Sequence, residues 1–220
     1  KMSQRVAWAF VSILAVAIAA PNLLPAGEGA ADGWTALVNG TDLQGWKFHF
    51  GKQGAGNDGT FTVKDGILIC SGTPAGYMYT EKSYGNYTLQ CAFAFKRPAG
   101  LQDDAEFRGN SGCLIHVGQK NALGVWPRSI EVQGAYRQLG IILPIPRDLK
   151  CRHTFDKQAL ARVIKPVGEF NQLEIEVKGG NMVISVNGAV VSTVSDCELT
   201  QGPIGLQSEG AETHWKTIRI

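Results

Sequence analysis

The segment GEFNQLEIEVKGGNMVISVNGAVV, residues 168–191, decides the fold class. It contains three runs of alternating apolar and polar residues: Asn171–Lys178, Met182–Val186 and Ala189–Thr193. Such alternation is typical of β-strands, whose side chains point to opposite faces in turn. The runs are separated by Gly179-Gly180-Asn181 and by Asn187-Gly188. An Asn-Gly pair favours a tight hairpin turn because both residues accept a positive φ, so the segment predicts short strands joined by turns.

The rest of the chain continues the pattern of short strands separated by turns. Further candidate strands are Gly66–Ser71, Tyr87–Phe95, Gly112–Val117, Ile130–Gln133, Ile204–Ser208 and Lys216–Ile220. Only Asp156–Ile164 has a helical pattern, and it is short. Many short strands with little helix predict an all-β sandwich of two sheets or a jelly roll.

The composition excludes several classes of protein. Of the 220 residues, 44% are hydrophobic and 18% are charged, which is typical of one globular core rather than a disordered chain. The formal net charge is +2, so the charge balance gives no reason to expect nucleic acid as a partner. The sequence contains no zinc spacing, phosphate-binding loop or dinucleotide-binding motif, and we expect no metal and no cofactor.

The N-terminal segment predicts export. Residues Val6–Ala20 are almost entirely apolar and follow Lys1 and Arg5, the arrangement of a secretory signal or of a membrane anchor that extends to Leu24. We expect an apolar helix within residues 1–20, a linker at 21–33 and a folded domain at 34–220. In either case the domain would be periplasmic or extracellular, and residues 6–24 would tether it to the membrane if they are retained.

The five cysteines leave at least one thiol unpaired. Cys151 and Cys197 lie near predicted loops and are the pair most suited to a disulfide. Cys70, Cys91 and Cys113 alternate with apolar residues, which predicts small core side chains.

Strand alternation also groups the polar candidates. In Tyr87–Phe95, one face carries Leu89, Cys91, Phe93 and Phe95, which we assign to the core. In Gly112–Val117, we assign Cys113, Ile115 and Val117 to one face and Leu114 and His116 to the other. If the strands are neighbours, one polar sheet face would collect His116, Glu131, Gln133 and Gln90.

These polar residues have two interpretations. Glu131 would be a catalytic base and His116 an acid or ligand, or both would be paired side chains on a solvated sheet face. Glu209 would be a second carboxylate at the rim of the face, or a turn residue before Gly210. Trp126 precedes Pro127 in a loop and would be an exposed platform for stacking a sugar, although a tryptophan in a sandwich is more often part of the core.

Five ordered motifs resemble one family. They are the segment quoted above, WTALVNGTDLQGW at 34–46, GNSGCLIHV at 109–117, SIEVQG at 129–134 and GPIGLQSEGAETHWKTIRI at 202–220. Together they resemble the 3-keto-disaccharide hydrolase domain, also called domain of unknown function 1080. The resemblance runs from Trp34 to Ile220.

The resemblance implies a concanavalin A-like jelly roll whose concave face handles glycosides. It implies cleavage of 3-keto sugars outside the cytoplasm, by removal of the C2 proton and elimination of the C1 substituent. On the matching positions, Glu131 and His116 would be catalytic. The residues expected to contact a carbohydrate or keto-glycoside ligand are Gln133, Gln90, Asn110, Trp126 and Glu209.

The chain departs from the family pattern on this face. His116 stands where the family usually has arginine, and Gly134 and Ala135 follow the EVQ motif where an aspartate is frequent. An imidazole does not replace a permanently charged guanidinium. Two functions therefore remain open. One is a sugar-active exported domain, and the other is a non-catalytic, membrane-anchored accessory subunit with partner subunits in a membrane complex.

Overall fold

A computed structural model describes residues 33–51 and 56–220. The predicted apolar helix at 1–20 lies outside the described residues, as does nearly all of the predicted linker. Within the described ranges, no helix has the length and apolar character needed to cross a membrane.

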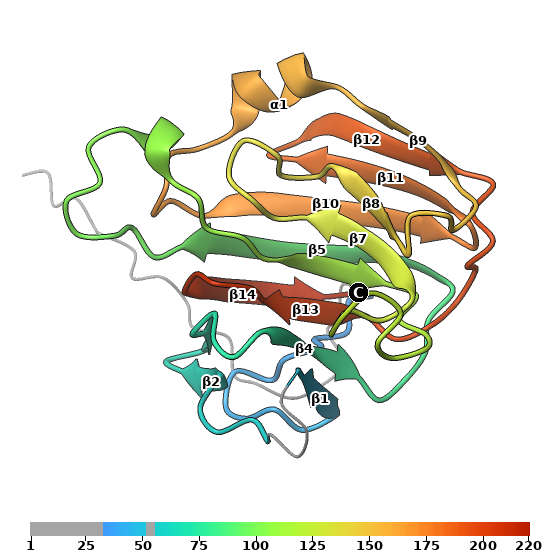
Figure 1. Cartoon of the computed structure of the whole chain (residues 1–220), viewed down its shortest axis with the longest axis horizontal. Helices are drawn as coiled ribbons and strands as arrows, with labels where there is room; N and C mark the ends of the chain where they lie inside the picture. Colours follow the sequence, from blue (N-terminus) through green and yellow to red (C-terminus); the bar gives the residue numbers. More distant parts are fainter. Residues whose placement is uncertain (1–32, 52–55) are drawn as a thin grey trace, which may run out of the picture.

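Two antiparallel sheets form the domain (Figure 1). The six-stranded sheet contains, in spatial order, β1 (Trp46–Phe50), β4 (Gly76–Thr80), β13 (Gly205–Ser208), β6 (Gly112–Ile115), β7 (Ser129–Gln133) and β8 (Ile142–Ile145). The eight-stranded sheet contains β2 (Phe61–Lys64), β3 (Ile67–Cys70), β14 (Thr213–Arg219), β5 (Asn86–Phe95), β10 (Asn171–Lys178), β11 (Asn181–Val186), β12 (Ala189–Ser195) and β9 (Arg152–Phe155). The predicted all-β sandwich of two antiparallel sheets is confirmed.

The quoted segment forms three consecutive antiparallel strands, β10, β11 and β12. Asn187 and Gly188 have φ values of 48° and 85°, as the hairpin turn requires. The predicted helix is α1 (Lys157–Val163), which lies next to β12, and a short 3₁₀ helix, η1, spans Asp104–Glu106. Asp156 begins α1 by accepting hydrogen bonds from the backbone N–H groups of Gln158 and Ala159.

The core lies between the two sheets. Leu89, Cys91, Phe93 and Phe95 all belong to the main hydrophobic core cluster, which confirms the predicted face of β5. The indole of Trp215 on β14 stacks on Phe93 with ring centroids 4.7 Å apart. Aromatic pairs of this kind contribute beyond the area that they bury.

All five cysteines are free thiols. Cys70, Cys91 and Cys113 are fully buried core residues, as predicted. The predicted disulfide between Cys151 and Cys197 is not formed. The two thiols interact, and each lies in a segment joined by the backbone hydrogen bond from Glu198 N to Lys150 O.

Candidate active site on the outer face of the six-stranded sheet

Strand register defines the polar face that carries the candidate site. Across β6 and β7, Gly112 is opposite Gln133 and Leu114 is opposite Glu131. Because side chains alternate, these residues share the face that points away from the core, which we call the outer face. Glu131 and Gln133 therefore lie on one face, as the alternation predicts.

Glu131 is the most perturbed carboxyl group on the outer face. It is only 6% exposed, and burial followed by the nearby charge of Glu209 raises its pKa to about 7. The side-chain amide of Gln207 opposes this rise in pKa. Burial also raises the pKa of Glu209, while Asn110 lowers it. A carboxylate with a pKa near neutrality is suited to proton transfer at physiological pH.

The raised pKa predicts a pH-dependent cost of burying Glu131. Below pH 4.5, its ordinary pKa, the group is protonated in both the folded and unfolded states, and the cost is absent. As pH rises toward 7, the unfolded chain loses this proton first and the folded state is destabilised. Glu131→Gln should therefore raise the free energy of unfolding above pH 7 by up to about 3 kcal/mol. Urea titrations at pH 4 and pH 8 test this expectation, and a gain of equal size at both values would contradict it.

The side chains of Gln133 and Asn110 accept hydrogen bonds from the backbone next to the site. The Oε1 atom of Gln133 accepts hydrogen bonds from Gly134 N at 2.8 Å and Ala135 N at 3.0 Å. Asn110 Oδ1 accepts from Ser111 N, and Asn110 forms a β-bridge with Glu209. The carbonyl of Gln133 is thus used to hold the following loop, and only its NH₂ group remains for a substrate.

A pocket of about 430 Å³ lies at the Gln133 end of the outer face. The segment around η1 forms one wall and residues 135–138 form the other. A hydrogen bond of 3.2 Å from the Tyr136 hydroxyl to Asp104 Oδ2 joins the walls. Asn110 and Gln133, two of the predicted contact residues, line this pocket together.

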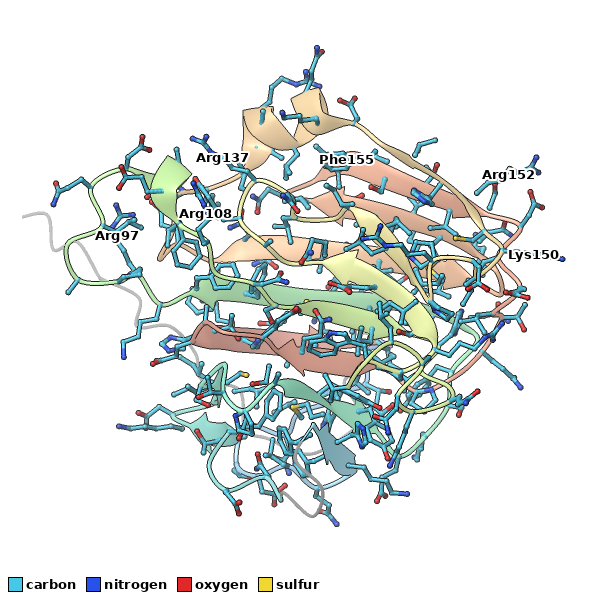
Figure 2. All side chains as sticks on the ribbon, in the orientation of Figure 1. Arg97, Arg108, Arg137, Lys150, Arg152 and Phe155 are labelled. Atoms are coloured by element: carbon cyan, nitrogen blue, oxygen red, sulfur yellow. The ribbon has the colours of Figure 1, made fainter. Side chains whose placement is uncertain are left out.

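Two arginines also line this pocket, Arg108 and Arg137, and Figure 2 shows them at the same end of the molecule. Among the described residues, neither has a carboxylate within ion-pair distance. Arg108 donates to the backbone oxygens of Ala105 and Phe107. The sequence prediction missed both arginines, since loop residues carry no periodic signal. The positive charge that the strands lack is supplied here by loops.

His116 does not lie with Glu131, and its predicted place on the outer face is wrong. Its backbone has a φ of 58°, which breaks the alternation after β6. Its Nε2–H donates to Gly179 O at 3.0 Å, in the turn between β10 and β11 of the other sheet. Val117 consequently packs with Leu114 instead of with the core set to which the alternation assigns it. His116 joins the two sheets, and burial lowers its pKa.

Gln90 also lies apart from Glu131, because β5 belongs to the eight-stranded sheet. Its amide donates to Glu174 Oε2 at 2.6 Å and its carbonyl accepts from the guanidinium of Arg219. The predicted grouping of Gln90 with Glu131 is therefore wrong. Alternation gives the face of a strand but not the sheet to which the strand belongs.

Trp126 is half-buried rather than an exposed platform. It packs against an apolar group on the outer face formed by Tyr77, Leu114, Val117 and Ile145. His49 on β1 lies in the same area, with its ring 5.3 Å from that of Tyr77 and its Nε2–H donating to Asn121 Oδ1. The sequence reading missed His49, although the alternation of WKFHF at 46–50 contains the signal.

No cluster of three or more His, Cys, Asp or Glu side chains suited to a metal ion occurs in the described part of the chain. What the outer face offers is a buried carboxylate, a second carboxylate that interacts with it, and amide and hydroxyl groups. Such a set can move a proton and hold sugar hydroxyl groups.

Comparison with known structures identifies proteins with a similar fold. A protein from Parabacteroides distasonis, provisionally described as a glycosyl hydrolase, matches with a TM-score of 0.62 and 20% identity, over 86% of this chain and 93% of that one. A second structure with the same description and source matches at 0.59 and 19% identity, over 84% and 97%. The carbohydrate-binding module CBM66 from Bacillus subtilis matches at 0.50 and 13% identity, over 79% and 93%. These likenesses confirm the jelly-roll fold.

Comparison with curated protein sequences finds no match. The family comparison does: the sequence model of the 3-keto-alpha-glucoside-1,2-lyase-like domain matches residues 33–220. This match covers the whole of the described sandwich and confirms the resemblance carried by the five motifs. The chain belongs to the family of 3-keto-disaccharide hydrolase domains, described as 3-keto-alpha-glucoside-1,2-lyase-like.

Proposed function

We propose that this domain cleaves the glycosidic bond of 3-keto glycosides by elimination across C1 and C2, with Glu131 as the base. The observation that carries the proposal is the buried Glu131 carboxyl group, with a pKa of about 7, on the outer face of a sheet in this family's fold. The family description as 1,2-lyase-like supports an elimination across these two carbon atoms.

The chemistry follows from the ketone at C3, which acidifies the proton on C2. Glu131 takes that proton, and the electron pair of the C–H bond moves into an enolate on the C3 oxygen. Collapse of the enolate forms the C1–C2 double bond and breaks the bond between C1 and the glycosidic oxygen. The leaving oxygen then takes a proton and departs as an alcohol. This sequence needs an acid near C1 as well as a base near C2.

Glu209 fits the role of the acid, because it is the carboxyl group that interacts with Glu131 and burial raises its pKa. Glu209→Gln should therefore slow cleavage of a methyl 3-keto-α-glucoside by about 10²-fold. A 4-nitrophenyl glycoside should lose much less, since 4-nitrophenolate leaves without a proton. Equal losses for the two substrates would contradict the acid role.

The same variant predicts a change in the pH profile. Glu131 acts as a base only when ionised, so kcat/KM should rise with pH through about 7. Removing the charge of Glu209 lowers the pKa of Glu131, and the rise should move to lower pH. An unchanged midpoint in Glu209→Gln would show that the two groups do not interact during turnover.

A direct assay tests the function itself. The purified protein is incubated with 4-nitrophenyl 3-keto-α-glucoside and with its unoxidised parent, 4-nitrophenyl α-glucoside. We expect release of 4-nitrophenol from the keto sugar alone, because only the ketone acidifies C2. Release from neither sugar, or binding without cleavage, would contradict the proposal.

We further propose that this activity lies outside the cytoplasm. The support is the apolar segment at 6–20 with its basic start. Fractionation of the producing cell, with the mature N-terminus read by mass spectrometry, tests this proposal. Recovery of the protein in the cytoplasm would contradict it.

A further inference from the structure

The outer face holds polar groups that the fold leaves without a full hydrogen bond. The Tyr77 hydroxyl and both polar side-chain atoms of Gln207 are buried, and within the described part of the chain none of them meets the geometry of a full hydrogen bond. The Gln207 amide lies near the Glu131 carboxyl group, whose pKa it lowers. Tyr77 and Gln207 are 0% and 1% exposed. An unpaired buried polar group costs about 1–3 kcal/mol, so two such residues side by side indicate a place for a polar ligand atom.

Register places the two residues together. Tyr77 on β4 is directly opposite Gln207 on β13, and both side chains lie on the outer face. Residues opposite each other on one face of an antiparallel pair have Cβ atoms about 5 Å apart. The two residues therefore lie side by side on the outer face.

The side chain of Gln207 extends from this pair toward Glu131. It crosses Gly112 on β6, where an added Cβ atom would lie 2.7 Å from Gln207 Oε1. Gly112 is opposite Gln133 on β7, two residues from Glu131. The Gln207 amide is close enough to lower the pKa of Glu131. Only glycine at position 112 leaves this path open, so the donor groups lie beside the base.

We propose that Tyr77 and Gln207 donate hydrogen bonds to the C3 oxygen of a 3-keto sugar and stabilise the enolate formed when Glu131 removes the C2 proton. This inference rests on the proposed function, which names a base and an acid, and it adds the groups that stabilise the enolate. Neutral donors in a site closed to water interact strongly with a developing negative charge. Burial raises the pKa of Tyr77 well above its ordinary value, so the hydroxyl keeps its proton and acts as a donor.

Kinetics of two substitutions test this role. Tyr77→Phe and Gln207→Met remove the donors and keep the shape of the side chains. Each should lower kcat for the 3-keto glycoside by about 10²-fold with little change in KM. The free energy of unfolding should stay the same or rise, because an unpaired buried group has been removed. Turnover equal to wild type in both variants would overturn the inference.

Tyr87→Phe is the matched control. The Tyr87 hydroxyl is also buried without a partner, but it belongs to β5 in the other sheet. Its removal should leave turnover unchanged. A loss in Tyr87→Phe equal to that in Tyr77→Phe would show a general packing effect and would also overturn the inference.

A binding measurement separates this inference from the proposed function. Methyl 3-deoxy-3-nitro-α-glucoside, used as its nitronate anion, carries a negative charge where the enolate oxygen would lie. Wild type should bind it more tightly than methyl α-glucoside, and Tyr77→Phe should lose most of that preference. If wild type cleaves no 3-keto glycoside, the proposed function fails, and this comparison still decides the role of the pair. Equal affinity of wild type for the two sugars would overturn it.

Discussion

Glu131→Gln is expected to lower kcat/KM for a 3-keto glycoside by about 10³-fold, within the range contributed by a positioned general base. Glutamine keeps the size of the side chain and its ability to hydrogen-bond, but it cannot take the C2 proton. The fold should remain intact, because the substitution removes a carboxyl group whose burial costs free energy. Initial rates at pH 8, where the wild-type group is ionised, give the measurement.

Glu174→Gln provides the matched control for Glu131→Gln. Glu174 lies on β10 in the other sheet, where it accepts a hydrogen bond from Gln90. Glu174→Gln also replaces a carboxyl group by an amide, but away from the outer face, so it should leave turnover unchanged. Full activity in Glu131→Gln, or an equal loss in Glu174→Gln, would remove Glu131 from the role of base.

Trp215→Ala should give a large loss of stability, about 3–5 kcal/mol in the free energy of unfolding. The indole is 1% exposed and stacks on Phe93, and its Nε1–H donates to Thr213 Oγ1 at 2.9 Å. Alanine would leave a cavity in the core next to β14, which lies between β3 and β5 in the eight-stranded sheet. Urea unfolding of both proteins measures the difference.

Trp215→Phe separates the contribution of aromatic stacking to stability from those of side-chain volume and the N–H donor. Phenylalanine keeps an aromatic ring against Phe93 but loses volume and the N–H donor, so its cost should lie between those of wild type and Trp215→Ala. A loss below about 1 kcal/mol for Trp215→Ala would mean that the core collapses around the cavity, contrary to the close packing expected of a protein interior.

The fold could be predicted from the sequence because its strongest signals are local. The turns at Gly179–Asn181 and Asn187–Gly188 and the alternation between them predicted β10–β12, and Asp156 marked the start of α1. Strands that are short, exposed or interrupted by proline gave no such signal. β9 is mostly exposed, and β8 contains Pro144.

The site could be predicted only in part, because it combines strands that are distant in the sequence. Alternation placed Glu131 and Gln133 on one face, and the family motifs included Asn110 and Glu209. His116 was misplaced because a single positive φ ends the alternation, and Gln90 because its strand pairs in the other sheet. The unpaired atoms of Tyr77 and Gln207 become visible only when the packing of the whole face is known.

The fate of the C2 hydrogen tests the central claim most directly. A methyl 3-keto-α-glucoside carrying deuterium at C2 is incubated with the protein in H₂O, and the sugar product is examined by mass spectrometry and NMR. Elimination started by Glu131 predicts that deuterium is lost to solvent in every turnover by wild type and that Glu131→Gln neither cleaves nor exchanges it. A cleaved sugar that retains its C2 deuterium would mean direct displacement at C1 and would contradict the role assigned to Glu131.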